Sequence, residues 1–303
     1  MYKKIRKLVK RIIIVPLNLV YKIKPEVSLK IVFYLRQGHK LNLKNPRTYN
    51  EKINWLKLYY RNDLMPKCAD KYTVRSYVED CGLGHILNEL LWEGFDPKEI
   101  PFDDLPNKFV IKVTHGSGNN IICEDKDKLD IDKTIKKLNK WLNKKYLPSY
   151  GEWFYGKIKP RIIIEKFLED KNYKVPVDYK MYYFNNINGK KDIAFTAIDT
   201  NRFVNLKRVV YDRQWNRIEN IYLNYPNDEN ASFEKPKLYK EMVEYAKILA
   251  KPFPHVRVDF YIINDKIFFG ELSFTNEAGF GKIKPQSLNL QMGEWIKLPP
   301  KNV

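Results

Sequence analysis

The sequence contains few cysteines, and their spacing does not suit covalent or metal cross-links. Its 303 residues include only Cys68, Cys81 and Cys123, which are unevenly spaced and form no Cys-x-x-Cys pair. Neither a zinc knuckle nor a disulfide framework is therefore indicated. This cysteine usage predicts that the protein works in a reducing compartment, the cytoplasm.

A long apolar run is also missing. The strongest candidate, residues 12–20, is about nine residues long, contains Pro16 and Asn18, and follows the basic residues 3–11. This arrangement imitates a signal peptide, but more lysines follow in place of a small-residue cleavage site. Because about 20 apolar residues are needed to span a bilayer, the segment is also too short for a transmembrane helix.

Negative charge is scarce, and the excess of positive charge is concentrated near the N-terminus. The chain has 55 Lys and Arg against 36 Asp and Glu. Residues 1–60 hold fifteen of these basic residues but only Glu26 and Glu51, which gives +13 of the total of +19. Two interpretations stay open: the segment lies on an anionic inner membrane leaflet as a peripheral contact, or it packs on the protein's own core. No nucleic-acid-binding motif accompanies the charge, so nucleic acid is not an expected partner.

Two strand-like runs near the C-terminus each place a carboxylate among apolar residues. In residues 256–261 apolar and polar side chains alternate, which is the period of a strand with one buried face. Residues 267–274 form the expected partner strand of a hairpin. Register decides whether Asp259 and Glu271 meet, because a shift of one residue moves a side chain to the other face.

We expect a three-residue loop at residues 264–266, which sets Asp259 opposite Glu271. The same loop sets Arg257 opposite Ser273, whereas a two-residue loop would send the two acids to opposite faces. Facing carboxylates repel each other unless a proton or a cation lies between them. Mg²⁺ binds one or two carboxylates together with phosphate oxygens, so this register predicts a metal site. An ordinary hairpin with solvated acids is the alternative.

A lysine interrupts another apolar run immediately before a glycine-rich turn. Residues 107–113 are typical of a short buried strand that contains Lys112, and Thr-His-Gly-Ser-Gly follows at residues 114–118. A lysine on a buried strand is costly unless it is paired. The turn offers backbone N–H groups that can surround an anion, so phosphate is the natural candidate ligand. The turn is neither a Walker A loop nor a GxGxxG fingerprint.

Taken in order, these features resemble the ATP-grasp superfamily. The ordered set is Lys112 with its glycine-rich turn, the segment Glu165-Lys166-Phe167-Leu168, Lys180, Arg257-x-Asp259 and Glu271. Five longer stretches are similar to the TupA-like ATP-grasp family, namely NPRTYNEKINWLKLYYR, ADKYTVRSYV, KFVIKVTHGSGNNII, RVDFYIINDKIFFGELSFTNEAGFG and MGEWIKLP. The similarity runs from about Gln37 to Pro299. That family is associated with bacterial surface polysaccharide and teichuronopeptide synthesis.

The resemblance implies an α+β fold in which two α+β lobes with antiparallel sheets clamp ATP. It further implies a basic, mainly helical N-terminal region at residues 1–62 and an ATP-grasp catalytic region at residues 63–303. Within the catalytic region, the lobe with the glycine-rich loop covers about residues 107–166, and the metal-binding lobe covers about residues 167–299.

Roles for individual residues also follow from the resemblance. Lys112 and Lys180 would neutralise the α- and β-phosphates, and Arg257 would stabilise charge on the transferred γ-phosphoryl group, which makes these three the expected catalytic residues. The residues expected to bind Mg²⁺ are Asp259, Glu271 and Ser273, although many ATP-grasp enzymes have Asn at the position of Ser273. The residues expected to bind ATP are Lys71, Lys112, His115, Gly116, Ser117, Gly118, Asn119, Glu165, Lys166, Phe167, Leu168 and Lys180.

We therefore expect an ATP- and Mg²⁺-dependent carboxylate–amine ligase that forms an amide through an acyl phosphate. Its partners would be ATP, a carboxylate-bearing glycan or amino acid, and an amine acceptor. The product would decorate a bacterial surface polysaccharide or its precursor. The alternative is a nucleotide-sugar glycosyltransferase, in which a pair of acids, Asp125 and Asp127 or Asp130 and Asp132, would bind the metal.

Overall fold

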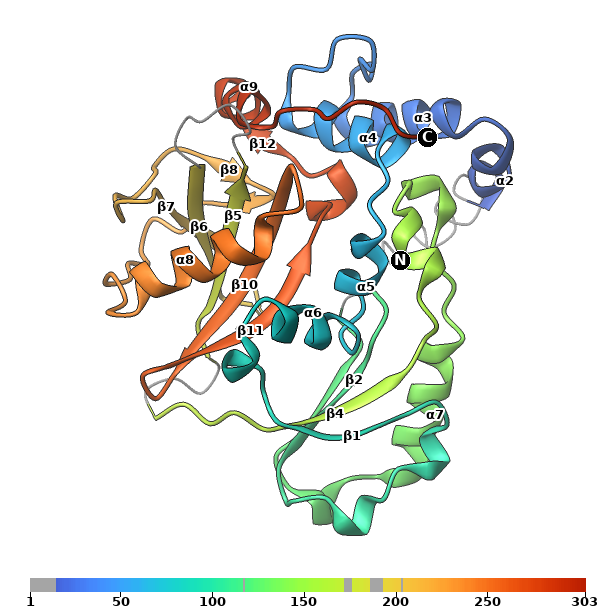
Figure 1. Ribbon diagram of the computed structural model, residues 1–303, viewed down its shortest axis with the longest axis vertical. Coiled ribbons are helices and arrows are strands. Elements are labelled where there is room, and N and C mark those ends of the chain that lie inside the picture. The colour runs from blue at the N-terminus through green and yellow to red at the C-terminus, as the bar shows by residue number, and fades with distance from the viewer. Residues whose placement is uncertain (1–14, 117, 172–175, 186–192, 203) are drawn as a thin grey trace.

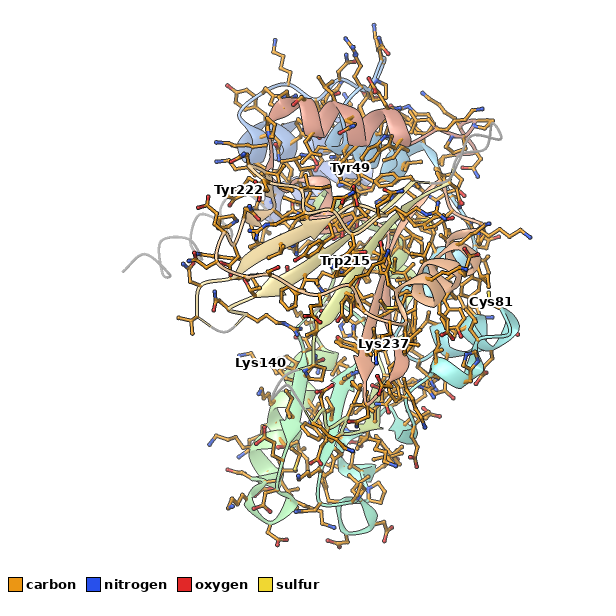
Figure 2. The ribbon with its side chains drawn as sticks, turned by 90° about the vertical axis from the view of Figure 1, so that its left-hand side faces the viewer. Tyr49, Cys81, Lys140, Trp215, Tyr222 and Lys237 are labelled. Atoms are coloured by element: carbon orange, nitrogen blue, oxygen red, sulfur yellow. The ribbon has the colours of Figure 1, made fainter. Side chains whose placement is uncertain are left out.

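The computed structural model describes residues 15–116, 118–171, 176–185, 193–202 and 204–303. Ser117 and the basic residues 3–11 lie outside the described residues. Two antiparallel sheets form two lobes, and a group of helices covers one end of the larger lobe (Figure 1). In the perpendicular view these helices lie above the larger lobe, and the smaller lobe lies below it (Figure 2). The predicted α+β class with antiparallel sheets is confirmed.

Three sheets account for the described strands, and all paired strands within them are antiparallel. The four-stranded sheet has the order β1 (Leu90–Gly94), β4 (Ile162–Lys166), β2 (Phe109–Val113) and β3 (Asn120–Cys123). The five-stranded sheet has the order β11 (Lys266–Ser273), β10 (His255–Ile263), β5 (Asp178–Phe184), β6 (Ile193–Thr200) and β7 (Lys207–Tyr211). A small sheet consists of β12 (Ile283–Lys284), β8 (Tyr222–Leu223) and β9 (Tyr225–Pro226).

The α-helices of the described residues pack on these sheets or on one another. They are α2 (Val15–Ile23), α3 (Pro25–Gln37), α4 (Tyr49–Tyr59), α5 (Leu64–Ala69), α6 (Val74–Asp80), α7 (Ile131–Leu142), α8 (Tyr239–Ala250) and α9 (Gln286–Trp295). The spacing of Thr48 and Glu51 in the sequence predicts a capping box and a helix over residues 48–61, and α4 begins there with the complete box. Helix α7 covers the four-stranded sheet with Leu138, and α8 covers one face of the five-stranded sheet with Met242 and Leu249.

The sequence predicts a single helix over residues 69–81, ended by Gly82, and the structure corrects this prediction. Helix α5 ends at Ala69, and α6 does not begin until Val74. The Asp70 side chain explains the interruption, because its Oδ1 accepts hydrogen bonds from the backbone N–H groups of Tyr72 and Thr73 at 2.7 and 2.9 Å. Such a local bond offers the backbone an alternative to the helix. The interruption keeps Asp70 and Lys71 at the wall of the central cavity instead of on a helix surface.

The face of the five-stranded sheet opposite α8 is apolar at one end of its strands and charged further along. At one end Tyr182, Phe184 and Phe195 pack against α4 and α9 in an apolar cluster that includes Tyr49 and Met292. Further along the same face, the side chains are charged and border a cavity. Because alternation puts Lys180 and Tyr182 on the same face, one strand both anchors the helices and supplies a site residue.

Candidate active site

The hairpin of β10 and β11 has the predicted register but reaches it in a different way. Asp259 faces Glu271, and Arg257 faces Ser273, as the sequence predicts. The predicted three-residue loop is wrong: Ile263 pairs with Lys266, which leaves a two-residue turn. Both turn residues, Asn264 and Asp265, have φ near +50°, at 49° and 57°. That is the geometry of a type I′ turn, which suits the twist of a hairpin.

A β-bulge at Gly270 restores the register that the short turn would otherwise destroy. The pair after Asp259 and Glu271 is Phe260 with Phe269, so Gly270 is an extra residue on β11. A Cβ atom at this position would lie 3.0 Å from the carbonyl oxygen of Asp259, which is tight for any side chain. Glycine therefore fits the bulge without any shift of the neighbouring strand, and the bulge brings the two acids to the same face.

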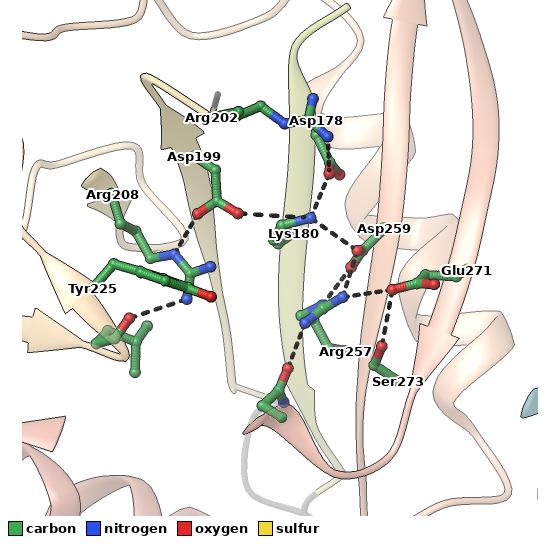
Figure 3. Close-up of polar contacts among 12 residues, drawn as sticks. Asp178, Lys180, Asp199, Arg202, Arg208, Tyr225, Arg257, Asp259, Glu271 and Ser273 are labelled. Carbon is green, nitrogen blue, oxygen red and sulfur yellow. Dashed lines mark hydrogen bonds and ion pairs between the residues drawn. The ribbon is translucent and has the colours of Figure 1, made fainter. Parts of the chain in front are cut away.

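A row of alternating charges crosses the five-stranded sheet on the face that borders the cavity (Figure 3). The Arg208 Nε atom lies 2.6 Å from Asp199 Oδ1, and Lys180 Nζ lies 3.9 Å from Asp199 Oδ2. Lys180 Nζ also lies 3.1 Å from Asp259 Oδ2. We use the name charged row for Arg208, Asp199, Lys180, Asp259, Arg257 and Glu271, in the order of their strands from β7 to β11.

Arg257 is the cation between the two facing carboxylates. Its Nε and Nη2 atoms each donate to Asp259 at 2.6 Å, and Nη2 also donates to Glu271 Oε1 at 2.8 Å. Its Nη1 atom donates to Asn276 Oδ1 at 2.7 Å. These bonds use four of the five N–H groups of a guanidinium and leave one on Nη1. The repulsion expected between Asp259 and Glu271 is therefore relieved by an arginine.

The ions of the charged row hold one another in their charged forms. Burial disfavours charge on Lys180, but the carboxylates of Asp259 and Asp178 outweigh it and raise the pKa of this lysine. Burial likewise disfavours the Asp259 carboxylate, but Arg257 and Lys180 outweigh it and lower the pKa of this group. Lys180 also contacts Asp178 directly. The centre of the row is thus fully ionised at neutral pH.

A chain of hydrogen bonds runs from the Tyr183 carbonyl through His255, Tyr49 and Asn276 to Arg257 and fixes the guanidinium. The carbonyl of Tyr183 can only accept, so His255 Nδ1, 2.7 Å away, carries the proton and Nε2 accepts from the Tyr49 hydroxyl at 3.0 Å. Asn276 Nδ2 donates to the Tyr49 oxygen at 2.9 Å, and Asn276 Oδ1 accepts from Arg257. Burial lowers the pKa of His255 to about 3, so the ring stays neutral. The direction of each bond is therefore determined.

A cavity of about 640 Å³ separates the charged row from the glycine-rich turn. Such a volume suits a ligand of nucleotide size. The turn contributes His115, Gly116 and Asn119 to the lining, and Gly116 and Gly118 have φ values of 73° and 72°. Other lining residues include Lys71, Arg36 and Glu152, together with Lys180, Arg208, Arg257, Glu271 and Ser273 of the five-stranded sheet.

The lining offers hydrogen-bond donors that fit an anion. Asn119 Nδ2 and His115 Nδ1 are buried and have no hydrogen-bond partner among the described residues. Asn119 Nδ2 is a donor, whereas His115 Nδ1 is an acceptor, because Nε2 donates to the Lys144 carbonyl at 3.0 Å and burial lowers the pKa of the ring. Lys71 Nζ donates to the Gly116 carbonyl at 2.7 Å, and burial lowers the pKa of this lysine. A phosphate group at the turn would give Asn119 Nδ2 and Lys71 Nζ an acceptor.

Two predicted ATP ligands lie away from this lining and pair with each other. Lys112 Nζ lies 2.5 Å from Glu165 Oε2, across the neighbouring strands β2 and β4. Arg75 Nη1 lies 3.5 Å from the other oxygen of Glu165. The expectation that a buried-strand lysine needs a partner is thus met by Glu165. Both residues are nevertheless near the turn, because Lys112 lies at the end of β2 that leads into it and β4 pairs with β2.

The remaining predicted ATP ligands lie where the chain passes from one sheet to the other. Lys166 ends β4, is exposed, and pairs with Glu89 at 2.9 Å. Phe167 and Leu168 are half-buried in the segment between β4 and β5. A contact of these residues with adenine stays a prediction.

Several residues of the site are absent from the sequence prediction. Asp199 and Arg208 face each other on β6 and β7, and Asp178 closes the shell around Lys180. The period of two gives a partial signal, because Asp178 and Lys180 share a face of one strand. Asn276 and Tyr49 could not have been found in this way, since they come from a 3₁₀ turn and from α4.

The two lobes, the glycine-rich turn and the charged row together define an ATP-grasp fold. The chain belongs to the TupA-like ATP-grasp family, because the model of that family matches residues 51–297. This confirms the predicted family. A search of curated proteins finds no match to the chain.

Solved structures of ligases are similar to the chain at low sequence identity. A D-alanine–D-alanine ligase from Helicobacter pylori is 12% identical, with a TM-score of 0.44 over 84% of this chain and 70% of that chain. One from Bacillus anthracis is 14% identical, with a TM-score of 0.40 over 74% and 59%. A phosphoribosylamine–glycine ligase from Thermotoga maritima is 15% identical, with a TM-score of 0.41 over 70% and 48%. The chain spans less than two thirds of the length of the last two.

Within the described ranges, no helix combines the length and the apolar character needed to cross a membrane.

Proposed function

We propose that the protein is an ATP- and Mg²⁺-dependent ligase that joins a carboxylate to an amine. A carboxylate oxygen of the substrate attacks the γ-phosphorus of ATP, and ADP leaves as the acyl phosphate forms. The amine then attacks the acyl carbon, loses a proton and displaces inorganic phosphate, which leaves an amide. The observation that carries this proposal is the charged row, which places cations on one wall of a cavity that faces a glycine-rich turn.

The cavity offers cations for both ends of a polyphosphate. Lys71 and the donors of the turn would hold the phosphates on one wall, and Lys180 and Arg257 would hold them on the other. Arg257 retains one N–H group on Nη1 that no described residue accepts, and it can direct this group at charge that develops on the transferred phosphoryl group. Because Asp259, Glu271 and Asn276 already fix the guanidinium, it needs little reorganisation during the reaction.

Glu271 fits a magnesium ion better than Asp259 does. Among the described residues, Glu271 accepts from Arg257 and from the Ser273 hydroxyl, and both contacts use Oε1, so Oε2 is available for a metal. Asp259 is 2% exposed, and both of its oxygens are bound to Arg257 or Lys180. Among the described residues no group of three or more His, Cys, Asp or Glu side chains could hold a metal.

Mg²⁺ at this site would therefore depend on phosphate oxygens for most of its ligands. We assign Glu271 as its main protein ligand, with the Ser273 hydroxyl beside it. Asp259 would join only if its pair with Arg257 opened. The ion would neutralise phosphate charge and orient the γ-phosphoryl group.

The acid pairs of the glycosyltransferase alternative have structural roles. Asp125 accepts from the backbone N–H of Asp127 and pairs with Lys128, and Asp130 caps the first turn of α7 through the N–H of Lys133. Side chains that cap helices are explained without a metal. No observation favours the alternative.

An isotope experiment tests the ligase proposal. The protein is incubated with ATP, Mg²⁺, an amine and a candidate carboxylate labelled with ¹⁸O, and the released inorganic phosphate is examined by mass spectrometry. Transfer of one ¹⁸O from the carboxylate to phosphate, together with ADP, is expected because the acyl phosphate passes that oxygen to phosphorus. Release of a nucleoside diphosphate from a sugar donor, with no labelled phosphate, would contradict the proposal.

Two variants serve as matched controls for this experiment. Glu271→Gln should reduce the rate at which labelled phosphate appears, on the order of 100-fold, because the substitution removes the charge available to the metal. Asp125→Asn should leave the reaction unchanged, because that acid lies in a 3₁₀ turn of the other lobe.

We further infer that the amide decorates a bacterial surface polysaccharide or its precursor, and that the enzyme works at the cytoplasmic side. The family similarity and the unpaired Cys68, Cys81 and Cys123 support this placement. Mass spectrometry of the surface glycan, with and without the gene, tests it. Loss of an amide substituent is expected, and an unchanged glycan would argue for a different substrate.

A further inference from the structure

The helices α2 and α3 have two apolar faces, of which only one is buried. Leu17, Leu29, Val32 and Phe33 pack into a cluster with Trp55 and other core residues. On the opposite side every fourth residue is apolar and between 39% and 80% exposed: Val15, Leu19, Ile23, Val27, Ile31 and Leu35. We call these six residues the exposed stripe. A spacing of four keeps side chains on one side of a helix.

Positive charge borders the exposed stripe. Lys22, Lys30 and Arg36 are exposed on the same two helices, Lys24 is exposed between them, and Glu26 is the sole acid in residues 15–37. Glu26 is already paired with Lys30 at 2.6 Å. Apolar side chains flanked by lysines are typical of helices that lie in the interface of an anionic bilayer.

The stripe also has a suitable position in the molecule. Helices α2 and α3 lie at the periphery, at the end away from α7 (Figure 1). Arg36, which follows Leu35 of the stripe, lines the central cavity and donates to the Tyr150 hydroxyl at 3.0 Å. A surface held against the stripe would therefore lie beside the cavity.

We propose that the exposed stripe docks the protein on the surface of an anionic lipid bilayer, with the lysines on lipid headgroups. The inference goes beyond the ligase activity and does not require it. Combined with the proposed function, it implies a lipid-linked substrate that reaches the cavity from the side of Arg36, and that part rests on the proposed function.

Vesicle co-sedimentation of the full chain tests the docking surface. The protein should bind vesicles that contain phosphatidylglycerol and should bind pure phosphatidylcholine far less. The variant Leu19→Ser/Ile23→Ser/Ile31→Ser should lose binding by about tenfold or more, because three apolar contacts with the bilayer are removed. All three side chains are exposed, so the variant should fold, as ATP binding will verify.

A matched control removes the same number of exposed apolar side chains elsewhere. Ile122→Ser/Ile131→Ser/Val204→Ser changes residues on β3, on α7 and in the segment before β7. This variant should bind vesicles as the unchanged protein does.

A second pair of variants tests the charges. Lys22→Gln/Lys24→Gln should weaken binding to the anionic vesicles, whereas Lys133→Gln/Lys136→Gln on α7 should not. The proposal is overturned if the unchanged protein ignores anionic vesicles or if the serine variant of the stripe still binds them. It is also overturned if light scattering shows that the stripe variant merely converts a dimer into a monomer. ATP turnover with a soluble acceptor is measured separately, so failure of docking and failure of the ligase proposal give different results.

Discussion

The two facing acids, Asp259 and Glu271, have very different surroundings, although a strand pattern treats them alike. Asp259 is buried between Lys180 and Arg257, whereas the side chain of Glu271 is 39% exposed at the cavity. Removing one partner of a buried ion pair is far more costly than removing one that water can still reach. One acid therefore mainly holds the row together, and the other is free to act on a ligand.

We expect Asp259→Asn and Glu271→Gln to fail for different reasons. Asp259→Asn should lower the free energy of unfolding by about 3–5 kcal/mol, because it leaves two buried cations undercompensated. Glu271→Gln should change stability little but reduce turnover on the order of 100-fold. Urea unfolding and ADP release measured on both variants check this. Equal losses of stability would show that the difference in burial has no energetic consequence.

The histidine behind Arg257 makes stability depend on pH. Burial lowers the pKa of His255 to about 3, whereas an unfolded histidine titrates near 6.5. Between these values the unfolded state binds the additional proton, so stability falls as the pH decreases through that window. The slope from this residue is about 1.4 kcal/mol per pH unit.

We expect His255→Gln to flatten this part of the pH dependence. The variant should be less stable at pH 7, because the bonds to Tyr49 and Tyr183 are imperfectly replaced. Urea midpoints at several pH values between about 4 and 7.5 check the prediction. A slope identical to that of the unchanged protein would mean that other groups dominate the acid response.

Among the elements, those with strong local signals were predicted best. Helix α4 follows from its capping box, and the hairpin follows from its alternation. The break between α5 and α6 was missed because one side chain, Asp70, competes with the helix. Asp199 and Arg208 were missed because their pairing depends on the register of β6 with β7, and that register has no local signature.

The bulge in β11 predicts an asymmetric response to substitution. Gly270→Ala should cost about 1–3 kcal/mol, since its Cβ would press on the Asp259 carbonyl, and it should also reduce turnover by displacing Glu271. Asp265→Gly in the turn should be nearly neutral, because glycine adopts positive φ without strain. Thermal unfolding and ADP release compare the two. A harmless Gly270→Ala would show that the strand can shift without loss.

For the molecule as a whole, the helical layer and the catalytic lobes share one packed interior. Lys57 of α4 is 2% exposed, and its Nζ donates to the carbonyls of Tyr150 and Ala278 at 2.7 Å each. The ring of Phe280 lies 4.0 Å away from the same atom. Burial lowers the pKa of Lys57 to about 7. The boundary near residue 62 stays a prediction, but α4 is fastened to segments far along the chain.

We expect Lys57→Met to destabilise the whole molecule by about 2–4 kcal/mol, because two buried carbonyls lose their donor. Lys52→Met is a suitable control: it lies on the same helix, is only half-buried and donates to one carbonyl, that of Ile296. Urea unfolding followed by tryptophan fluorescence checks the difference. If the two variants lose similar stability, Lys57 is no special connection between the layers.

The short turn and the bulge of the hairpin have one further consequence, which concerns parity. Successive side chains of a strand point to opposite faces of the sheet. Whether two residues of a hairpin share a face therefore depends on whether the number of residues between them is even or odd. The turn is one residue shorter than expected, and Gly270 adds one residue back, so the sum is preserved. The bulge takes up this extra residue, so the facing of the two acids does not depend on Gly270 being present. Deleting Gly270 alone should leave Glu271 opposite Asp259, because Phe269 would still pair with Phe260, whereas adding one residue between Gly270 and Glu271 should turn Glu271 to the other face.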